Sequence, residues 1–325
     1  MKAKIALLVG TSLVLFFVDL NLAIAQPWPQ KPIMLIVPFA SGGGTDAFAR
    51  PLAMQLDQQL GVRVLIDNRA GGGGTVGAAA AAKAAPDGYT FFVGAAHHAI
   101  AQTVYPKLTY NIESDFVPIG MISRVPHVVV LGPGKVPART LSELIAHARA
   151  NPAKVNYASG GSGTTQHFAG ELFKLITKMQ IQHVPYRGAG PMMQDLLAGH
   201  VDMAFDGLGS SAAQVREGRL RGLAVTAPKR VTSLPDVPTA EEAGVPGFEV
   251  STWYALWAPK NTPATILERI TKELQIALQT ATVKQVWESN GSEMPSMMGA
   301  EFGAFVSSEV VRWGKVAHDA GVKIE

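Results

Sequence analysis

Two glycine-rich stretches, FASGGGTD at residues 39–46 and ASGGSGTT at residues 158–165, carry the strongest structural signal in this 325-residue chain. Each follows a strand-like run, at 33–38 and 155–158, and each precedes a segment with helical periodicity. A strand, a glycine turn and a helix start leave backbone N–H groups unpaired at the positive end of a helix dipole. This arrangement is typical of an anion-binding site, and here it occurs twice.

The first 25 residues have the pattern of an export signal. Lys2 and Lys4 supply the charged start, residues 5–18 are apolar, and Ala23-Ile24-Ala25 supplies small residues for cleavage before Gln26. The apolar stretch is shorter than the roughly 20 residues that a membrane-spanning helix needs. The sequence therefore predicts a periplasmic protein with a signal peptide at 1–25.

Composition narrows the class of protein further. About 300 residues remain after cleavage, which is enough for two domains with their own cores. The chain has no cysteine, so no disulfide stabilises it. Its formal net charge of +3 falls to +2 when Lys2, Lys4 and Asp19 leave with the signal. So small an excess argues against nucleic acid as a partner, because phosphate binding needs clustered Lys and Arg.

Strand-like runs alternate with helical stretches along the rest of the chain, which predicts an α/β fold with largely parallel sheets. The strand candidates are 33–38, 62–67, 89–94, 116–122, 128–132, 155–158, 201–206 and 222–226. Pro118 would confine the strand at 116–122 to a sheet edge. Capping boxes at Thr140…Glu143 and Thr239…Glu242 predict two helix starts.

Proline-rich joints near residues 125–137 and 235–246 suggest where the chain passes between domains. We expect a hinge near 123–124 and a return crossing near 250–252. Residues 26–123 and 252–325 would then form a discontinuous first domain, and residues 124–251 the second. Each domain would carry one of the two glycine-rich elements.

The polar residues beside these elements have local interpretations as well as functional ones. Asp46, in the first turn of its helix, could cap the loop or contact a ligand directly. His167 and Glu171 are i, i+4 neighbours that could pair on one helix face. They lack a third ligand for a metal, and in His97-His98 adjacent side chains point in different directions. The sequence therefore predicts no metal site.

Enzyme and cofactor signatures are weak. Residues 72–77 match G-x-G-x-x-G, but the acidic residue expected about 20 positions later is missing, which favours a tight turn over a dinucleotide site. No G-x-S-x-G elbow occurs, and no nucleophile lies beside a base and its orienting acid. We therefore expect a binding protein without a cofactor. A hydrolase or nucleotide-binding enzyme is the weaker alternative.

Matched motifs, in order, show that the chain from Trp28 onward resembles the exported solute receptors of the tripartite tricarboxylate transporter family, often called Bug proteins. The motifs are Trp28-Pro29, Lys31-Pro32-Ile33, Val37-Pro38-Phe39, Gly42-Gly43, Asp46, Ala49-Arg50, Asp67-Asn68-Arg69, Gly71, Ala85-Pro86-Asp87-Gly88-Tyr89-Thr90, Tyr157-Ala158-Ser159, Gly163-Thr164, His167, Val184-Pro185-Tyr186-Arg187-Gly188, Val201-Asp202, Phe205-Asp206, Leu234-Pro235-Asp236-Val237-Pro238-Thr239, Glu242-Ala243-Gly244 and Pro246-Gly247-Phe248-Glu249.

The resemblance implies a two-lobed periplasmic-binding-protein fold, type II-like, with two crossing strands and a ligand cleft. Loops from both lobes would grip a di- or tricarboxylate or an aromatic acid through backbone amides. By motif position the implied ligand-binding residues are Phe39, Ala40, Ser41, Gly42, Gly43, Asp46, His97, Ser159, Gly160, Gly161, Ser162, Gly163, Thr164, Thr165, His167, Tyr186 and Asp206.

The family also implies a monomer that delivers its ligand to a membrane permease. A receptor that presents its ligand to a sensor protein is the alternative that the residues do not separate from transport. His97-His98 departs from the family pattern, which often has small polar residues at this position. Such an imidazole pair would suit a second carboxylate or an aromatic ring at the far end of the ligand.

Overall fold

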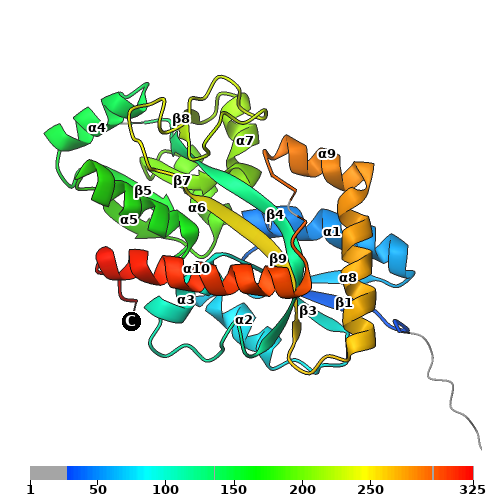
Figure 1. Cartoon of the computed structure of the whole chain (residues 1–325). Coiled ribbons are helices and arrows are strands. Elements are labelled where there is room, and N and C mark those ends of the chain that lie inside the picture. Colours follow the sequence, from blue (N-terminus) through cyan, green and yellow to red (C-terminus); the bar gives the residue numbers. More distant parts are fainter. Residues whose placement is uncertain (1–27, 135, 295, 325) are drawn as a thin grey trace, which may run out of the picture.

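The computed structural model describes residues 28–134, 136–294 and 296–324, so the predicted export signal at 1–25 lies outside the described residues. Strands and helices alternate along the first two thirds of the chain (Figure 1). The strands are β1 (Ile33–Val37), β2 (Val64–Asn68), β3 (Thr90–Ala95), β4 (Phe116–Leu131), β5 (Asn156–Ser159), β6 (Gln182–Pro185), β7 (Met203–Gly207), β8 (Arg221–Val225) and β9 (Ser251–Pro259). The helices are α1 (Gly44–Leu60), the short η1 (Gly72–Gly74), α2 (Thr75–Ala82), α3 (His97–Val104), α4 (Leu141–Ala150), α5 (Thr165–Thr177), α6 (Ala189–Leu197), α7 (Leu208–Arg216), α8 (Ala264–Gln279), α9 (Ala281–Ser289) and α10 (Gly299–Asp319).

The described strands form one sheet with two halves. Their order is β2-β1-β3-β9-β4-β7-β5-β6, and β8 also pairs with β4. Parallel strands β1, β2 and β3 make one half, and β5, β6 and β7 make the parallel part of the other. The long antiparallel pair β4 and β9 runs from one half to the other (Figure 1).

Strand β4 changes partner where the two halves meet. It pairs with β9 up to Pro126 and with β7 from His127 onward. The predicted hinge at 123–124 lies in this strand, and the predicted return crossing at 250–252 coincides with the start of β9. The domain boundaries themselves remain a prediction, but the two strands that could flex between the halves are β4 and β9.

The predictions for β4 were partly wrong. The two strands expected at 116–122 and 128–132 are one continuous strand. The expected edge position of Pro118 agrees with the structure, because among the described strands only β9 pairs with this end of β4, and β7 and β8 join it from residues 127 and 128 onward. The register between β4 and β9 shifts between Pro118 and Gly120. Such an irregularity removes the need for a ladder hydrogen bond from the proline, which has no N–H to donate.

Two hydrophobic clusters lie on opposite faces of the sheet. Along β1, Leu35 and Val37 belong to one cluster and Ile36, between them, belongs to the other. Phe92 on β3 shares the cluster of Ile36, while its neighbour Phe91 shares that of Leu35. This alternation is the two-residue period of a strand covered on both faces. The fold is therefore three layers thick, with helices outside and the sheet between them.

The two predicted capping boxes had different outcomes. Thr140 Oγ1 accepts the N–H of Glu143 at 3.2 Å, and α4 follows as expected. Thr239 and Glu242 make the reciprocal bonds of a box at 3.1 and 2.8 Å, but the chain forms only turns there. Gly244 adopts a φ of +87°, which ends the turn before a helix can grow. The prediction of a second helix was wrong.

Candidate functional site

A cavity of about 50 Å³ lies between the two halves of the sheet. A water molecule occupies roughly 10–15 Å³ by this measure, so the cavity has room for about four water-sized groups. The residues that line it are Phe39, Gly43, Gly44, Thr45, Ala95, His97, His127, Gly160, Thr164, Thr165, Gln166, Ala189, Asp206, Gly207, Ser210, Thr252 and Tyr254.

Five of the described helices begin at this cavity. Lining residues lie in the first turn of α1, α3, α5, α6 and α7, and each of these helices follows directly on a strand of the sheet. Ligands in open α/β sheets gather at the carboxyl ends of the strands, which is where these helices start. The first N–H groups of a helix precede any intrahelical acceptor, so they point outward at the positive end of its dipole.

The charge around the cavity comes from backbone rather than from basic side chains. No Lys or Arg occurs among the described lining residues, and Asp206 is their only carboxylate. Five positive helix ends in a closed space stabilise a bound anion without any cation. The geometry thus suits one negatively charged group held by amide hydrogens, at Gly44 and Thr45 on one side and Thr165 and Gln166 on the other.

Asp46 fixes the first glycine loop. Its carboxylate accepts the N–H of Gly42 at 3.0 Å, Arg50 Nε at 2.7 Å and Asn68 Nδ2 at 3.1 Å. Burial alone would raise the pKa of Asp46, but these three donors outweigh that effect and hold its pKa below the ordinary value. Asp46 does not line the cavity, so the geometry supports the loop-fixing interpretation.

Several amides of the second loop are used by the protein itself. Gly160 N–H donates to Gln166 Oε1 at 2.5 Å, and Gly161 N–H donates to Ser159 Oγ at 3.1 Å. Gly163 N–H donates to His167 Nδ1 at 3.2 Å. The sequence suggested that these loop amides would face a ligand. In this conformation the outward amides are instead those of the first turn of α5.

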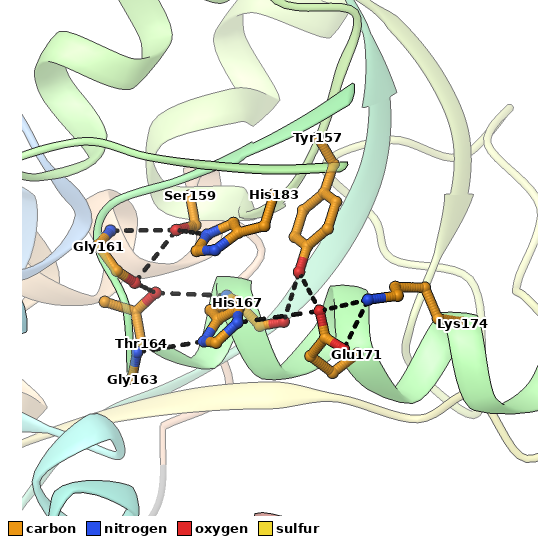
Figure 2. Close-up of polar contacts among 9 residues, drawn as sticks. All are labelled: Tyr157, Ser159, Gly161, Gly163, Thr164, His167, Glu171, Lys174 and His183. Carbon is orange, nitrogen blue, oxygen red and sulfur yellow. Dashed lines mark hydrogen bonds and ion pairs between the residues drawn. The ribbon is translucent and has the colours of Figure 1, made fainter. Parts of the chain in front are cut away.

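A network of buried polar side chains supports this loop from behind (Figure 2). The rings of His167 and His183 stack 4.1 Å apart, and His183 Nε2 lies 2.6 Å from Ser159 Oγ. Glu171 accepts hydrogen bonds from Tyr157 Oη at 2.7 Å and from Lys174. Burial lowers the pKa of His167 to about 4, so its Nδ1 stays an acceptor for the loop at neutral pH.

Asp206 closes the wall on the side of β7. It accepts hydrogen bonds from Gln166 Nε2, from Ser210 Oγ at 2.6 Å and from Ser211 Oγ at 2.5 Å. Complete burial raises the pKa of Asp206, and these donors oppose the shift because they favour the charged form. The carboxyl group therefore orients the first turns of α5 and α7.

The predicted site residues divide into two groups. Phe39, Gly43, His97, Gly160, Thr164, Thr165 and Asp206 line the cavity. Ala40, Ser41, Gly42, Asp46, Ser159, Gly161, Ser162, Gly163, His167 and Tyr186 do not line it in this conformation. Most of the second group belong to the loops or support them, and Tyr186 donates its hydroxyl to Asp195 at 2.7 Å instead.

Sequence reasoning missed several lining residues. His127 and Tyr254 come from β4 and β9, whose pairing joins segments more than 120 residues apart. Gln166 and Ser210 lie in the first turns of α5 and α7, after the N-caps Thr164 and Gly207, and that position could have marked them as helix-start residues. In the described part of the chain no cluster of three metal-ligating side chains occurs, and no helix is both long and apolar enough to cross a membrane.

The two halves also touch at residues that do not line the cavity. Tyr105, which follows α3, donates its hydroxyl to the Ser162 carbonyl at 2.7 Å. Gly73 of η1 lies against the same carbonyl, so close that a Cβ on Gly73 would overlap it. These contacts join a loop from each half and hold the halves together.

Comparisons with known proteins agree with this geometry. The model of the tripartite tricarboxylate transporter family receptor matches residues 48–322. BugT of Bordetella pertussis (strain Tohama I) is 37% identical over 303 residues, which cover 93% of this chain and 93% of that protein.

Two solved structures extend the comparison. The periplasmic binding protein BugD superposes with a TM-score of 0.88 at 33% identity, covering 92% of this chain and all of that one. R. palustris Rpa4515 with adipate superposes with a TM-score of 0.88 at 36% identity, covering 91% of this chain and 99% of that one. The expectation of a two-lobed α/β fold of the periplasmic-binding-protein type is confirmed.

Proposed function

Because the chain belongs to the receptor family of tripartite tricarboxylate transporters, we propose that it captures a small carboxylate between its two lobes for a membrane permease. The observation that carries this proposal is the convergence of five helix N-termini on a cavity lined by no Lys or Arg among the described residues. The relative Rpa4515, which holds adipate, supports a carboxylate as the ligand class.

The helix ends can supply a useful share of the affinity. Each contributes about 0.3–1 kcal/mol toward a nearby anion, so five together contribute roughly 1.5–5 kcal/mol before mutual screening. That corresponds to a factor of about ten to several thousand in the dissociation constant. Hydrogen bonds from first-turn amides to a carboxylate add to it, because bonds to charged acceptors are stronger than neutral ones.

Capture and release would follow from bending of β4 and β9. The ligand would touch α1 and α3 in one lobe and α5, α6 and α7 in the other, so it binds the closed conformation better than an open one. A ligand shifts such an equilibrium only by this difference in affinity. Closure would then present a surface to the permease that the open form lacks.

We further propose that the protein works in the periplasm as a monomer and returns its ligand chemically unchanged. The periplasmic setting is supported by the likeness to BugD and by the export pattern at 1–25. A receptor without catalysis is supported by the wall itself, where Asp206 is already engaged by three donors.

The test uses proline at the first position of a helix, where it removes one N–H without breaking the helix. Thr165 is the first residue of α5, and its preceding residue, Thr164, has the extended backbone that proline requires. Ala281 is the matched control, because it begins α9 after Thr280 with the same type of cap and is exposed.

Isothermal titration calorimetry with a panel of small carboxylates, adipate included, should find a ligand that mass spectrometry recovers intact. Thr165→Pro should weaken its binding about 10- to 150-fold, the worth of a hydrogen bond to a charged group. Ala281→Pro should bind as the parent does. Equal affinities for the two variants, or no binding by any acid, would overturn the proposal.

A further inference from the structure

Two histidines form part of the cavity wall without making hydrogen bonds there. His97 lies in the first turn of α3 and is 4% exposed, and His127 lies on β4 and is completely buried. Among the described residues, His97 Nε2 and both ring nitrogens of His127 have no hydrogen-bond partner. Buried polar atoms are rarely left unpaired in folded proteins, so the two ring nitrogens of His127, a lining residue, point to a ligand group as their partner. His97 Nε2 lies beside Gly74, outside the lining, and the unpaired Nε2 of His98 is outside the lining as well.

The neighbouring histidine has a different role. His98 places Nδ1 2.7 Å from the hydroxyl of Tyr110 and packs edge-on against Phe92. It does not line the cavity. Of the pair His97-His98 that the sequence suggested for the far end of the ligand, only His97 lines the cavity, and the second histidine in the wall is His127.

Both wall histidines are neutral at physiological pH. Burial lowers the pKa of each to about 3, and the positive end of α3 also disfavours a charge on His97. Phe39 and Gly74 pack against His97, and His98 lies behind it. None of these neighbours carries a negative charge that would stabilise a protonated ring.

The other titratable groups of the wall do not change this balance. Asp206 on β7 is the one acid, and Gln166, Ser210 and Ser211 already donate to it. Burial raises the pKa of the Tyr254 hydroxyl on β9, so that group is neutral too. The wall therefore has one acid, Asp206, held by three donors, and no cationic side chain among the described residues.

We propose that the far end of the ligand, beside His97 and His127, is received as an uncharged hydrogen-bonding group, while its carboxylate sits at the first turns of α1 and α5. This inference rests on the proposed function and names the ligand class of the same site. The uncharged group is a hydroxyl, a carbonyl, or a carboxyl that carries its proton.

The reason is the chemistry of a neutral imidazole, which offers one N–H donor and one lone pair. A hydroxyl or a protonated carboxyl offers both a donor and an acceptor, so it can satisfy either nitrogen. A carboxylate only accepts, so it would leave the lone pair of the ring without a donor, and it would add an anion that no cationic side chain among the described lining residues balances. A diacid should therefore bind together with one proton, whereas a hydroxy acid should bind without one.

The test is calorimetry with three six-carbon acids: adipate, 6-hydroxyhexanoate and hexanoate. The titrations are done at pH 7.5 and 6.5, each in phosphate and in Tris. The difference in binding heat between the two buffers gives the number of protons that the complex takes up. At pH 7.5 we expect 6-hydroxyhexanoate to bind at least tenfold more tightly than adipate. Adipate should take up close to one proton and bind up to tenfold more tightly at pH 6.5, while 6-hydroxyhexanoate should show neither effect.

His127→Phe removes both ring nitrogens and keeps a flat ring. It should reduce the affinity for 6-hydroxyhexanoate more than that for hexanoate, so that their ratio falls toward one, and His127→Asn should restore part of the preference. His318→Phe is the matched control, since the His318 side chain is 89% exposed at the end of α10. In this control the ratio of the affinity for 6-hydroxyhexanoate to that for hexanoate should equal the ratio in the parent.

Two results would overturn the inference. One is adipate binding at pH 7.5 as tightly as 6-hydroxyhexanoate with no proton uptake, and the other is an unchanged ratio in a folded His127→Phe. In either case carboxylate binding would survive, so the proposed function would stand. The same titrations are done with a set of shorter acids: succinate, 4-hydroxybutanoate and butanoate. If no acid of either set bound, the proposed function and this inference would both fail.

Discussion

Closure of the two lobes can be blocked at one glycine outside the cavity. Gly73 adopts a φ of +61° in η1, and a Cβ there would lie 2.6 Å from Tyr105 Oη and closer still to the Ser162 carbonyl oxygen. The overlap with Ser162, which belongs to the other lobe, exists only when the lobes are closed, whereas Tyr105 lies in the same lobe as Gly73 and would meet the Cβ in both states. Gly73→Ala should therefore destabilise the closed conformation specifically.

The magnitude follows from the cost of overpacking, about 1–3 kcal/mol for an added methyl group in a tight contact. Since the ligand binds the closed form, its affinity should fall by the same free energy, or about 5- to 150-fold. The positive φ adds strain of about 1–2 kcal/mol in open and closed forms alike, so it lowers the melting temperature without changing affinity.

Gly61→Ala separates the backbone strain at positive φ from the overlap with the other lobe. Gly61 ends α1 with a φ of +68°, and a Cβ there would meet nothing within 4 Å. Both variants should lose similar thermal stability, but only Gly73→Ala should bind weakly in calorimetry and fail to become more compact with ligand in X-ray scattering. Equal affinities for the two variants would refute the idea that the lobes meet at Gly73 when ligand is bound.

Three further predictions follow from the contacts around the cavity. Tyr105→Phe removes the hydrogen bond to the Ser162 carbonyl, so calorimetry should show roughly fivefold weaker ligand binding, about 1 kcal/mol, with little change in melting temperature. Asp46→Asn loses a charged acceptor of three donors, and urea denaturation should show a loss of about 1.5–3 kcal/mol; an unchanged midpoint would contradict the loop-fixing role. His97 and His127 have pKa values of about 3 in the folded protein, below the unfolded value of about 6.5, so stability is full above pH 6.5 and is lost as the pH falls toward 3. Each contributes up to about 1.4 kcal/mol per pH unit, so a flat unfolding free energy between pH 6 and 5 would contradict their neutral burial.

The parts of the site that sequence could predict are those set by local signals. The strand, glycine turn and helix start at Gly43 and at Thr164 can be recognised within a dozen residues, and both caps line the cavity. The role of Asp46 followed from its place in a first turn. The family motifs then supplied the order of the elements and the two-lobed fold.

The parts that sequence could not predict depend on long-range pairing. His127 reaches the wall only because β4 leaves β9 and joins β7 at that residue. The strands at 116–122 and 128–132 were predicted as separate, because nothing local shows that β4 continues from its pairing with β9 to its pairing with β7. The loop amides were expected to be free, but whether Ser159 and His167 would bond to them depends on rotamers that no sequence pattern reveals.

An anion grip made of main-chain amides has a consequence for how such receptors diverge. Only proline can delete a peptide N–H, so nearly every point mutation at Thr165 keeps the backbone N–H that is proposed to hold the carboxylate. The part of the wall that contains His97 and His127 can change by substitution without affecting these amides. A changed wall would recognise a different chemical group at the other end of the ligand. Proteins with this fold can in this way change their specificity among organic acids while they keep the same binding site for the carboxylate that these acids share.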